Sequence, residues 1–109
     1  PNRAEYHLYV GRAANEAGNP KKAKDALAKA LELDQGLADA YWQRGVLRYR
    51  QGAVKDAIVD LQKALELRPT RYEAHADLAE AYDALGQERD AMEELKKAIA
   101  ADPDNSLWR

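Results

Sequence analysis

The sequence repeats with a period of 34 residues, and this period limits the folds open to the chain more than any single residue does. When the three 34-residue copies are aligned, five positions have the same residue in every copy. In the first copy these are Gly18, Ala23, Leu27, Lys29 and Ala30. Such a period indicates structural units that stack on their neighbours, because one unit cannot bury its apolar face alone. Arrays of this kind mostly hold other molecules, so we expect a binding or scaffolding protein.

Each copy has the pattern of two amphipathic helices joined by a glycine turn. In the first copy Tyr6 and Val10 fall on one helical face, and residues 18–20 interrupt that face. Asn19 can cap the second helix, and Pro20 suits its first turn. Strong helix formers outnumber β-branched residues throughout, so we predict an all-α fold without strands.

The repeated columns resemble the tetratricopeptide repeat family. The matching columns are the small residues Gly11, Gly45 and Ala79, the turn glycines Gly18, Gly52 and Gly86, the alanines Ala23, Ala57, Ala91, Ala30, Ala64 and Ala98, and the helix-ending Pro69 and Pro103. The resemblance implies three repeats, at residues 4–37, 38–71 and 72–105, with residues 106–109 starting a further helix. It also implies a right-handed α-solenoid of six helices in antiparallel hairpins, whose first helices line a concave groove.

The family binds peptides mainly through the inward face of each first helix. The matching positions are the predicted partner-binding residues Leu8, Tyr9, Arg12, Trp42, Gln43, Val46, Tyr49, Arg50, Glu73, Asp77, Glu80 and Asp83. Among them Trp42, Val46 and Tyr49 follow i, i+4, i+7 spacing and form one stripe along a helix. The equivalent stripes of the other copies are mostly polar. Aromatic residues dominate binding hot spots, so this stripe is the expected central anchor for a ligand.

A structural alternative for the same stripe stays open. Arg44 and Arg48 occupy positions where the family usually keeps apolar core residues. In this alternative helix 38–51 is rotated about its axis, and Trp42 and Tyr49 turn inward to fill the core space that the arginines leave. We expect Arg44 itself to bury its aliphatic stem and to keep its charged head paired or hydrated.

Charge is distributed unevenly along the array. The whole chain has a net charge of −2, yet residues 72–105 carry three basic and ten acidic side chains. An acidic end disfavours nucleic acid and favours a partner with basic character. The alternative is an acidic surface that only aids solubility.

One ligand class known for the family is not expected here. Family members that hold the C-terminal tails of heat-shock chaperones clamp carboxylates with Lys, Asn and Arg side chains. The matching positions of this chain are Leu8, Arg12, Gln43, Glu73 and Asp77. Two of these are acidic and would repel a terminal carboxylate. An amphipathic peptide with a basic end is the predicted ligand instead.

Nothing in the sequence points to an enzyme. His7 and His75 are the only histidines, and they lie two full periods apart, so they occupy one structural column instead of one site. The chain has no cysteine, and it has no phosphate-binding loop, nucleophile motif or metal-spaced histidine cluster. We expect no catalytic residue, no cofactor, no metal and no small-molecule substrate.

Membrane and nucleic-acid partners are not expected either. No apolar run approaches the ~18 residues that a membrane span needs. A basic cluster on the second helix lacks interleaved aromatic residues and favours a solvated convex face; it comprises Lys21, Lys22, Lys24 and Lys29. A protein or peptide remains as the expected partner.

Self-association is the alternative function. Open repeat ends can stack between copies, and a neutral-to-basic front with an acidic back favours head-to-tail contact. Because the chain starts with Pro1 instead of Met, we expect it to be a piece of a longer protein. The absence of cysteine leaves the compartment undetermined, with the cytoplasm slightly favoured.

Overall fold

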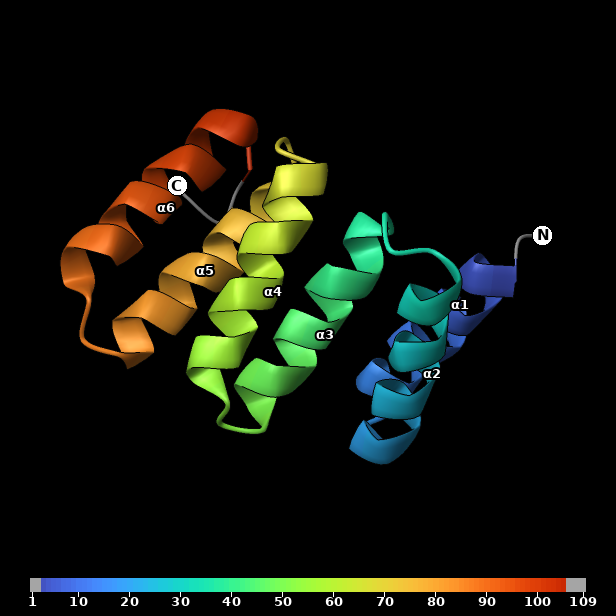
Figure 1. The fold of residues 1–109 in the computed structure, drawn as a ribbon. Coiled ribbons are helices and arrows are strands. Elements are labelled where there is room, and N and C mark those ends of the chain that lie inside the picture. Colours follow the sequence, from blue (N-terminus) through green and yellow to red (C-terminus); the bar gives the residue numbers. More distant parts are fainter. Residues whose placement is uncertain (1–2, 106–109) are drawn as a thin grey trace.

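The computed structural model describes residues 3–105, which form six α-helices and no strand (Figure 1). The helices are α1 (Arg3–Glu16), α2 (Pro20–Leu33), α3 (Ala38–Arg50), α4 (Val54–Leu67), α5 (Tyr72–Ala84) and α6 (Glu88–Ala101). Consecutive helices pack as three pairs that follow one another along the molecule. The all-α fold predicted from the composition and the solenoid implied by the family resemblance are therefore confirmed. The predicted helix start at residues 106–109 lies outside the described residues.

The glycine turns close each helix pair in the same way. Gly18, Gly52 and Gly86 have φ angles of 74°, 84° and 75°. A side chain is strained in this left-handed region, so only glycine fits without cost. In the first turn the N–H of Asn19 donates to the carbonyl oxygen of Ala14 at 2.8 Å. The identical glycine column is thus explained by backbone geometry alone.

A second repeated feature, the small residue of the first helix, is explained by close packing within a pair. A Cβ atom added at Gly45 would lie 2.9 Å from Leu61 Cγ and 3.3 Å from the carbonyl oxygen of Ala57. Ala57 itself is fully buried. Helices this close cannot accept a bulky residue at the crossing.

The buried apolar side chains form two clusters on opposite sides of α3. The first cluster joins α1 and α2 to Ala40 and Leu47 of α3. The second joins α4 to α5, with Trp42 and Tyr49 of α3 packed against it. Its buried members are Ile58, Leu61, Leu65, Ala74, Leu78 and Ala81. Helix α3 therefore connects both halves of the core, and its inner face lies next to α5.

The arginines of α3 are accommodated by a carboxylate from α4. Asp60 is 1% exposed. It accepts hydrogen bonds from Arg44 Nε (3.0 Å), Arg44 Nη2 (2.8 Å) and Arg48 Nη1 (2.8 Å). These bonds to Asp60 raise the pKa of Arg44, so its charge is held firmly. The prediction of a paired Arg44 head is confirmed. Ala40 and Leu47 of α3 are buried, and Trp42 and Tyr49 of the same helix pack against the second core cluster.

Candidate partner-binding groove

The first helices of the three pairs lie together on one side of the molecule. Helix α3 contacts both α1 and α5, whereas α2, α4 and α6 make few or no contacts with one another. This arrangement turns the inward faces of α1, α3 and α5 toward a shared surface, as the family resemblance implies.

The predicted partner-binding residues differ in how much surface they offer there. Leu8 and Gln43 are buried, at 6% and 8% exposure, so they support the surface more than they form it. The half-buried members are Trp42, Val46, Tyr49, Glu73 and Asp77. The exposed members are Tyr9, Arg12, Arg50, Glu80 and Asp83.

Trp42 is held in place by a side chain of α5 and by one from the turn that precedes α5. Its Nε1–H donates to Asp77 Oδ2 at 2.7 Å. The guanidinium of Arg71 lies over the indole, 4.7 Å from the ring centroid, at a distance typical of cation–π contacts. Arg71 also pairs with Asp39 (2.6 Å) and lies 3.9 Å from Glu73. The indole is therefore oriented before any ligand arrives.

Arg71 is a residue of this surface that the sequence did not single out. It precedes α5 and lies outside the inward positions of the family pattern. No periodic signal marks it, because its role depends on Trp42, which is unique to the second copy. Only the fold brings the two side chains together.

The carboxylates of α5 lie beside the aromatic residues of α3. Partial burial and the charges of Glu80, Asp83 and Asp77 raise the pKa of Tyr49. Burial likewise raises the pKa of Asp77, although the hydrogen bond from Trp42 opposes the shift. An aromatic stripe and an acidic row thus form adjacent strips of one face.

Polar contacts join the first two repeats at the other end of the groove. Asn15 Nδ2 donates to the carbonyl oxygen of Gln43 (3.1 Å) and to Gln43 Oε1 (2.9 Å). Arg50 Nη1 donates to the carbonyl oxygen of Asn15 (3.1 Å). Gln43 and Arg50 therefore fix the angle between α1 and α3, in addition to any contact with a partner.

The groove contains a small depression. The depression measures about 120 Å³ and lies among Tyr9, Arg12, Trp42 and Arg71. This volume suits one side chain of a partner, since small-molecule sites usually measure about 300–1,000 Å³. Within residues 3–105 no group of His, Cys, Asp and Glu side chains is arranged to hold a metal ion. In the same range, no helix is both long and apolar enough to cross a membrane.

Stacked helix pairs with an open inner face define a helical-repeat interaction scaffold. Family models for the tetratricopeptide repeat match residues 4–36 and 48–109. The chain belongs to the tetratricopeptide repeat family, and the family predicted from the repeated columns is confirmed.

Known proteins support the same assignment. The chain is 38% identical over 79 residues to the type IV pilus assembly protein PilF of Pseudomonas aeruginosa, covering 70% of this chain and 31% of PilF. The structure of MamA is similar at 31% identity with a TM-score of 0.87, covering 94% of this chain and 60% of MamA. YrrB, a TPR protein with an unusual peptide-binding site, is similar at 24% identity and a TM-score of 0.86, covering 98% and 55%. The chain thus spans less than a third of PilF and under two thirds of the other two.

The family assignment carries a general function. Tetratricopeptide repeats are protein–protein interaction modules that bind protein or peptide partners, and the repeat scaffold is generally non-catalytic. The tetratricopeptide repeat fold of this chain supports a protein–protein interaction module.

Proposed function

We propose that the inward face of α1, α3 and α5 binds an amphipathic peptide or helix, with its apolar side chains on α3 and its basic end on α5. The observation that carries this proposal is the aromatic stripe of Trp42, Val46 and Tyr49 lying beside the carboxylates of α5.

The aromatic stripe supplies the apolar half of the site. Trp42 and Tyr49 are half-buried and rest on the second core cluster, so their exposed edges belong to rigid side chains. Rigid aromatic residues lose little conformational entropy on binding, which favours them as anchors. Val46 lies between them and extends the apolar strip.

The carboxylates of α5 supply the charged half. Glu80 and Asp83 are exposed, and within residues 3–105 neither takes part in an ion pair. A Lys or Arg of a ligand can therefore approach both. A C-terminal carboxylate is repelled by the same pair, so a chaperone tail is not the proposed ligand.

The decisive test removes the aromatic anchor. We expect Trp42→Ala with Tyr49→Ala to weaken binding of a basic-ended amphipathic peptide by about 1,000-fold, since two hot-spot residues contribute ~2 kcal/mol or more each. Fluorescence anisotropy measures affinity, and circular dichroism measures helicity. Unchanged affinity in a folded variant would disprove the proposal.

A second variant guards against loss of fold in that double substitution. Val46→Glu places in α3 the residue that α5 has at the equivalent position, Glu80. Helicity should be retained while apolar contact is lost, so affinity should fall by about 10-fold. Full affinity with native helicity would show that the stripe serves the core alone.

The exposed apolar face of α6 favours self-assembly as a second candidate function. Met92, Leu95 and Ile99 are 61%, 41% and 38% exposed. Their counterparts one period earlier, Ile58, Leu61 and Leu65, are buried in the second core cluster.

The opposite end of the array disfavours regular stacking on that face. Tyr6 occupies the column of Ala40 and Ala74, which are fully buried where consecutive pairs meet. A tyrosine there would have to move before α6 of another copy could pack on α1. Light scattering across concentration and salt tests the candidate, because a monomer at every condition eliminates it.

A further inference from the structure

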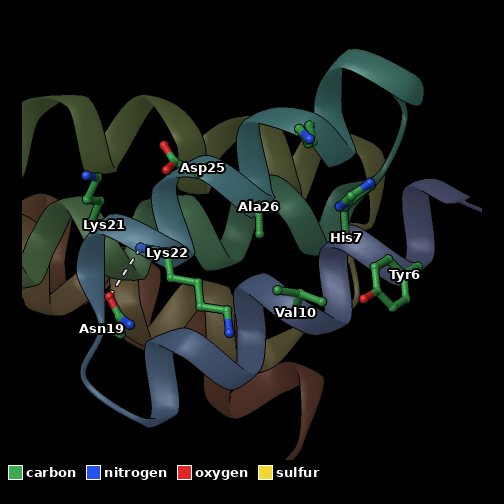
Figure 2. Close-up of a pocket in the computed structure, with 9 residues that line it drawn as sticks. Tyr6, His7, Val10, Asn19, Lys21, Lys22, Asp25 and Ala26 are labelled. Carbon is green, nitrogen blue, oxygen red and sulfur yellow. Dashed lines mark hydrogen bonds between the residues drawn. The ribbon is translucent and has the colours of Figure 1, made fainter.

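The first helix pair has a surface depression between α1 and α2, on a different face from the groove. It measures about 450 Å³ and is lined by His7 and Val10 of α1 and by Lys22, Ala26 and Lys29 of α2. Figure 2 shows His7 and Val10 rising from α1 and Ala26 facing them from α2. None of these residues belongs to the predicted groove.

The third helix pair has a carboxylate at the same position. Glu94, two periods after Ala26, is 9% exposed. Its Oε1 lies 2.9 Å from His75 Nδ1, and its Oε2 accepts a hydrogen bond from Lys97 Nζ at 3.1 Å. His75 and Lys97 are themselves two periods after His7 and Lys29. The first pair therefore has the histidine and the lysine of this cluster but lacks its carboxylate.

The second helix pair also has a buried carboxylate there. Asp60, one period after Ala26, accepts hydrogen bonds from Arg44 and Arg48. In two of the three pairs an acidic residue of the second helix thus contacts a basic side chain of the first helix. Ala26 makes the first pair the exception.

The basic side chains around Ala26 form no ion pair within residues 3–105. Within residues 3–105 the ring nitrogens of His7 accept or donate no hydrogen bond, and Lys22 and Lys29 form no ion pair. Lys22 occupies the column in which the later copies have Asp56 and Asp90. The first copy therefore has a basic residue in place of a second acidic one. Asp25 is the single acidic residue of the lining.

We propose that this depression binds a carboxylate side chain, Asp or Glu, carried on an apolar segment of a separate protein partner. The partner's carboxylate takes the position of Glu94, between His7 and Lys29. Val10 and the methyl group of Ala26 contact the apolar part, and Lys22 adds charge at the rim. Charge complementarity and the acid present in both later pairs favour this occupant. The protein would then bind a basic partner segment in its groove and an acidic partner segment on its first helix pair.

The first experiment supplies the missing carboxylate within the chain. Ala26→Glu should rebuild the cluster of the third pair and raise Tm by about 2–4 °C at low salt, as expected for a partly exposed ion pair. Ala26→Gln has the same size without the charge and should give no increase. Equal Tm values for the two variants would overturn the proposal.

The second experiment tests capture of an external carboxylate. The probes are a helical peptide with blocked ends and one Glu among leucines, and its Gln counterpart. Wild type should bind the Glu peptide at least about fivefold more tightly, a difference of ~1 kcal/mol. Ala26→Glu should abolish this preference, while Ala26→Gln and the groove variant Trp42→Ala should keep it.

Four further results would overturn the assignment. The first is equal affinity of wild type for both peptides, and the second is a Glu preference that persists in Ala26→Glu. The third is tighter binding of a phosphoserine peptide, which would identify phosphate as the ligand. Self-association that Ala26→Glu suppresses would likewise replace a separate partner with a second copy.

Discussion

Helices α3 and α5 occupy equivalent places in consecutive pairs but carry opposite chemistry on both faces. On the inner face α3 has Trp42, Val46 and Tyr49 where α5 has Ala76, Glu80 and Asp83. On the face toward the neighbouring helices α3 has Arg44 and Arg48 where α5 has Leu78 and Tyr82. Leu78 is 2% exposed in the second core cluster, whereas the arginine heads are paired with Asp60.

This contrast separates the residues that make the frame from those that make the surface. Ala40 and Ala74 are both fully buried, and the turn glycines have the same backbone angle in each pair. The backbone is thus set by small residues that α3 and α5 share. The other positions of α3 can therefore be either apolar or polar. The partly buried arginines at two of them are tolerated because Asp60 pairs with both.

The largest effect is expected from breaking the polar side of α3. Asp60→Ala leaves two partly buried arginine heads without their carboxylate, so unfolding free energy should fall by about 2–3 kcal/mol. Urea unfolding monitored by circular dichroism measures it. The equivalent change in the third pair, Glu94→Ala, should cost less because its Lys97 partner is 58% exposed.

A matched triple variant shows whether charge or shape matters at this position. Arg44→Leu and Arg48→Tyr copy α5, and Asp60→Ala copies the first pair. Replacing a buried ion cluster with apolar residues is often neutral, so stability should return to within about 1 kcal/mol of wild type. If Asp60→Ala alone were neutral, the arginines would not depend on Asp60.

A smaller loss of stability is expected from a substitution at the helix crossing, where α3 has Gly45 and α5 has the larger residue Ala79. Gly45→Ala brings a methyl group into contact with Leu61 and should cost about 1 kcal/mol, because overpacking outweighs the gain in helix propensity. Thermal unfolding measures the loss. Ala79→Gly, the reverse change in α5, is the control and should also cost ~1 kcal/mol, through propensity alone. A stabilised Gly45→Ala would mean that the spacing of α3 and α4 adjusts freely.

The smallest effect concerns the titration of Asp77 beside Trp42. Burial raises the pKa of Asp77 above its unfolded value, so its contribution to stability is fully present below about pH 4 and is lost as pH rises through the folded pKa. Asp77→Asn keeps an oxygen acceptor for Trp42 and removes that loss. We expect Tm to rise by about 1–2 °C at pH 7 and to match wild type at pH 3. Parallel Tm profiles from pH 3 to 7 would contradict the raised pKa.

The frame was predictable from the sequence, but the network around the groove was not. Columns that keep the same or a similarly small residue report local constraints, such as the positive φ of Gly52 and the close crossing at Gly45. The cation–π contact of Arg71 with Trp42 joins two positions that differ between copies, so no column reveals it. The same holds for Gln43, which the family pattern assigns to ligand binding but which is buried against Asn15.

The groove account is tested most directly by reversing the exposed charge of α5. The probe is a blocked amphipathic helical peptide ending in two Lys or two Gln residues, titrated at low salt by fluorescence anisotropy. Wild type should prefer the Lys peptide by about 10-fold, as two exposed ion pairs allow. Glu80→Lys with Asp83→Lys should abolish this preference, and Glu88→Lys with Asp90→Lys on α6 should keep it. An undiminished Lys preference after reversal of α5 would contradict the account.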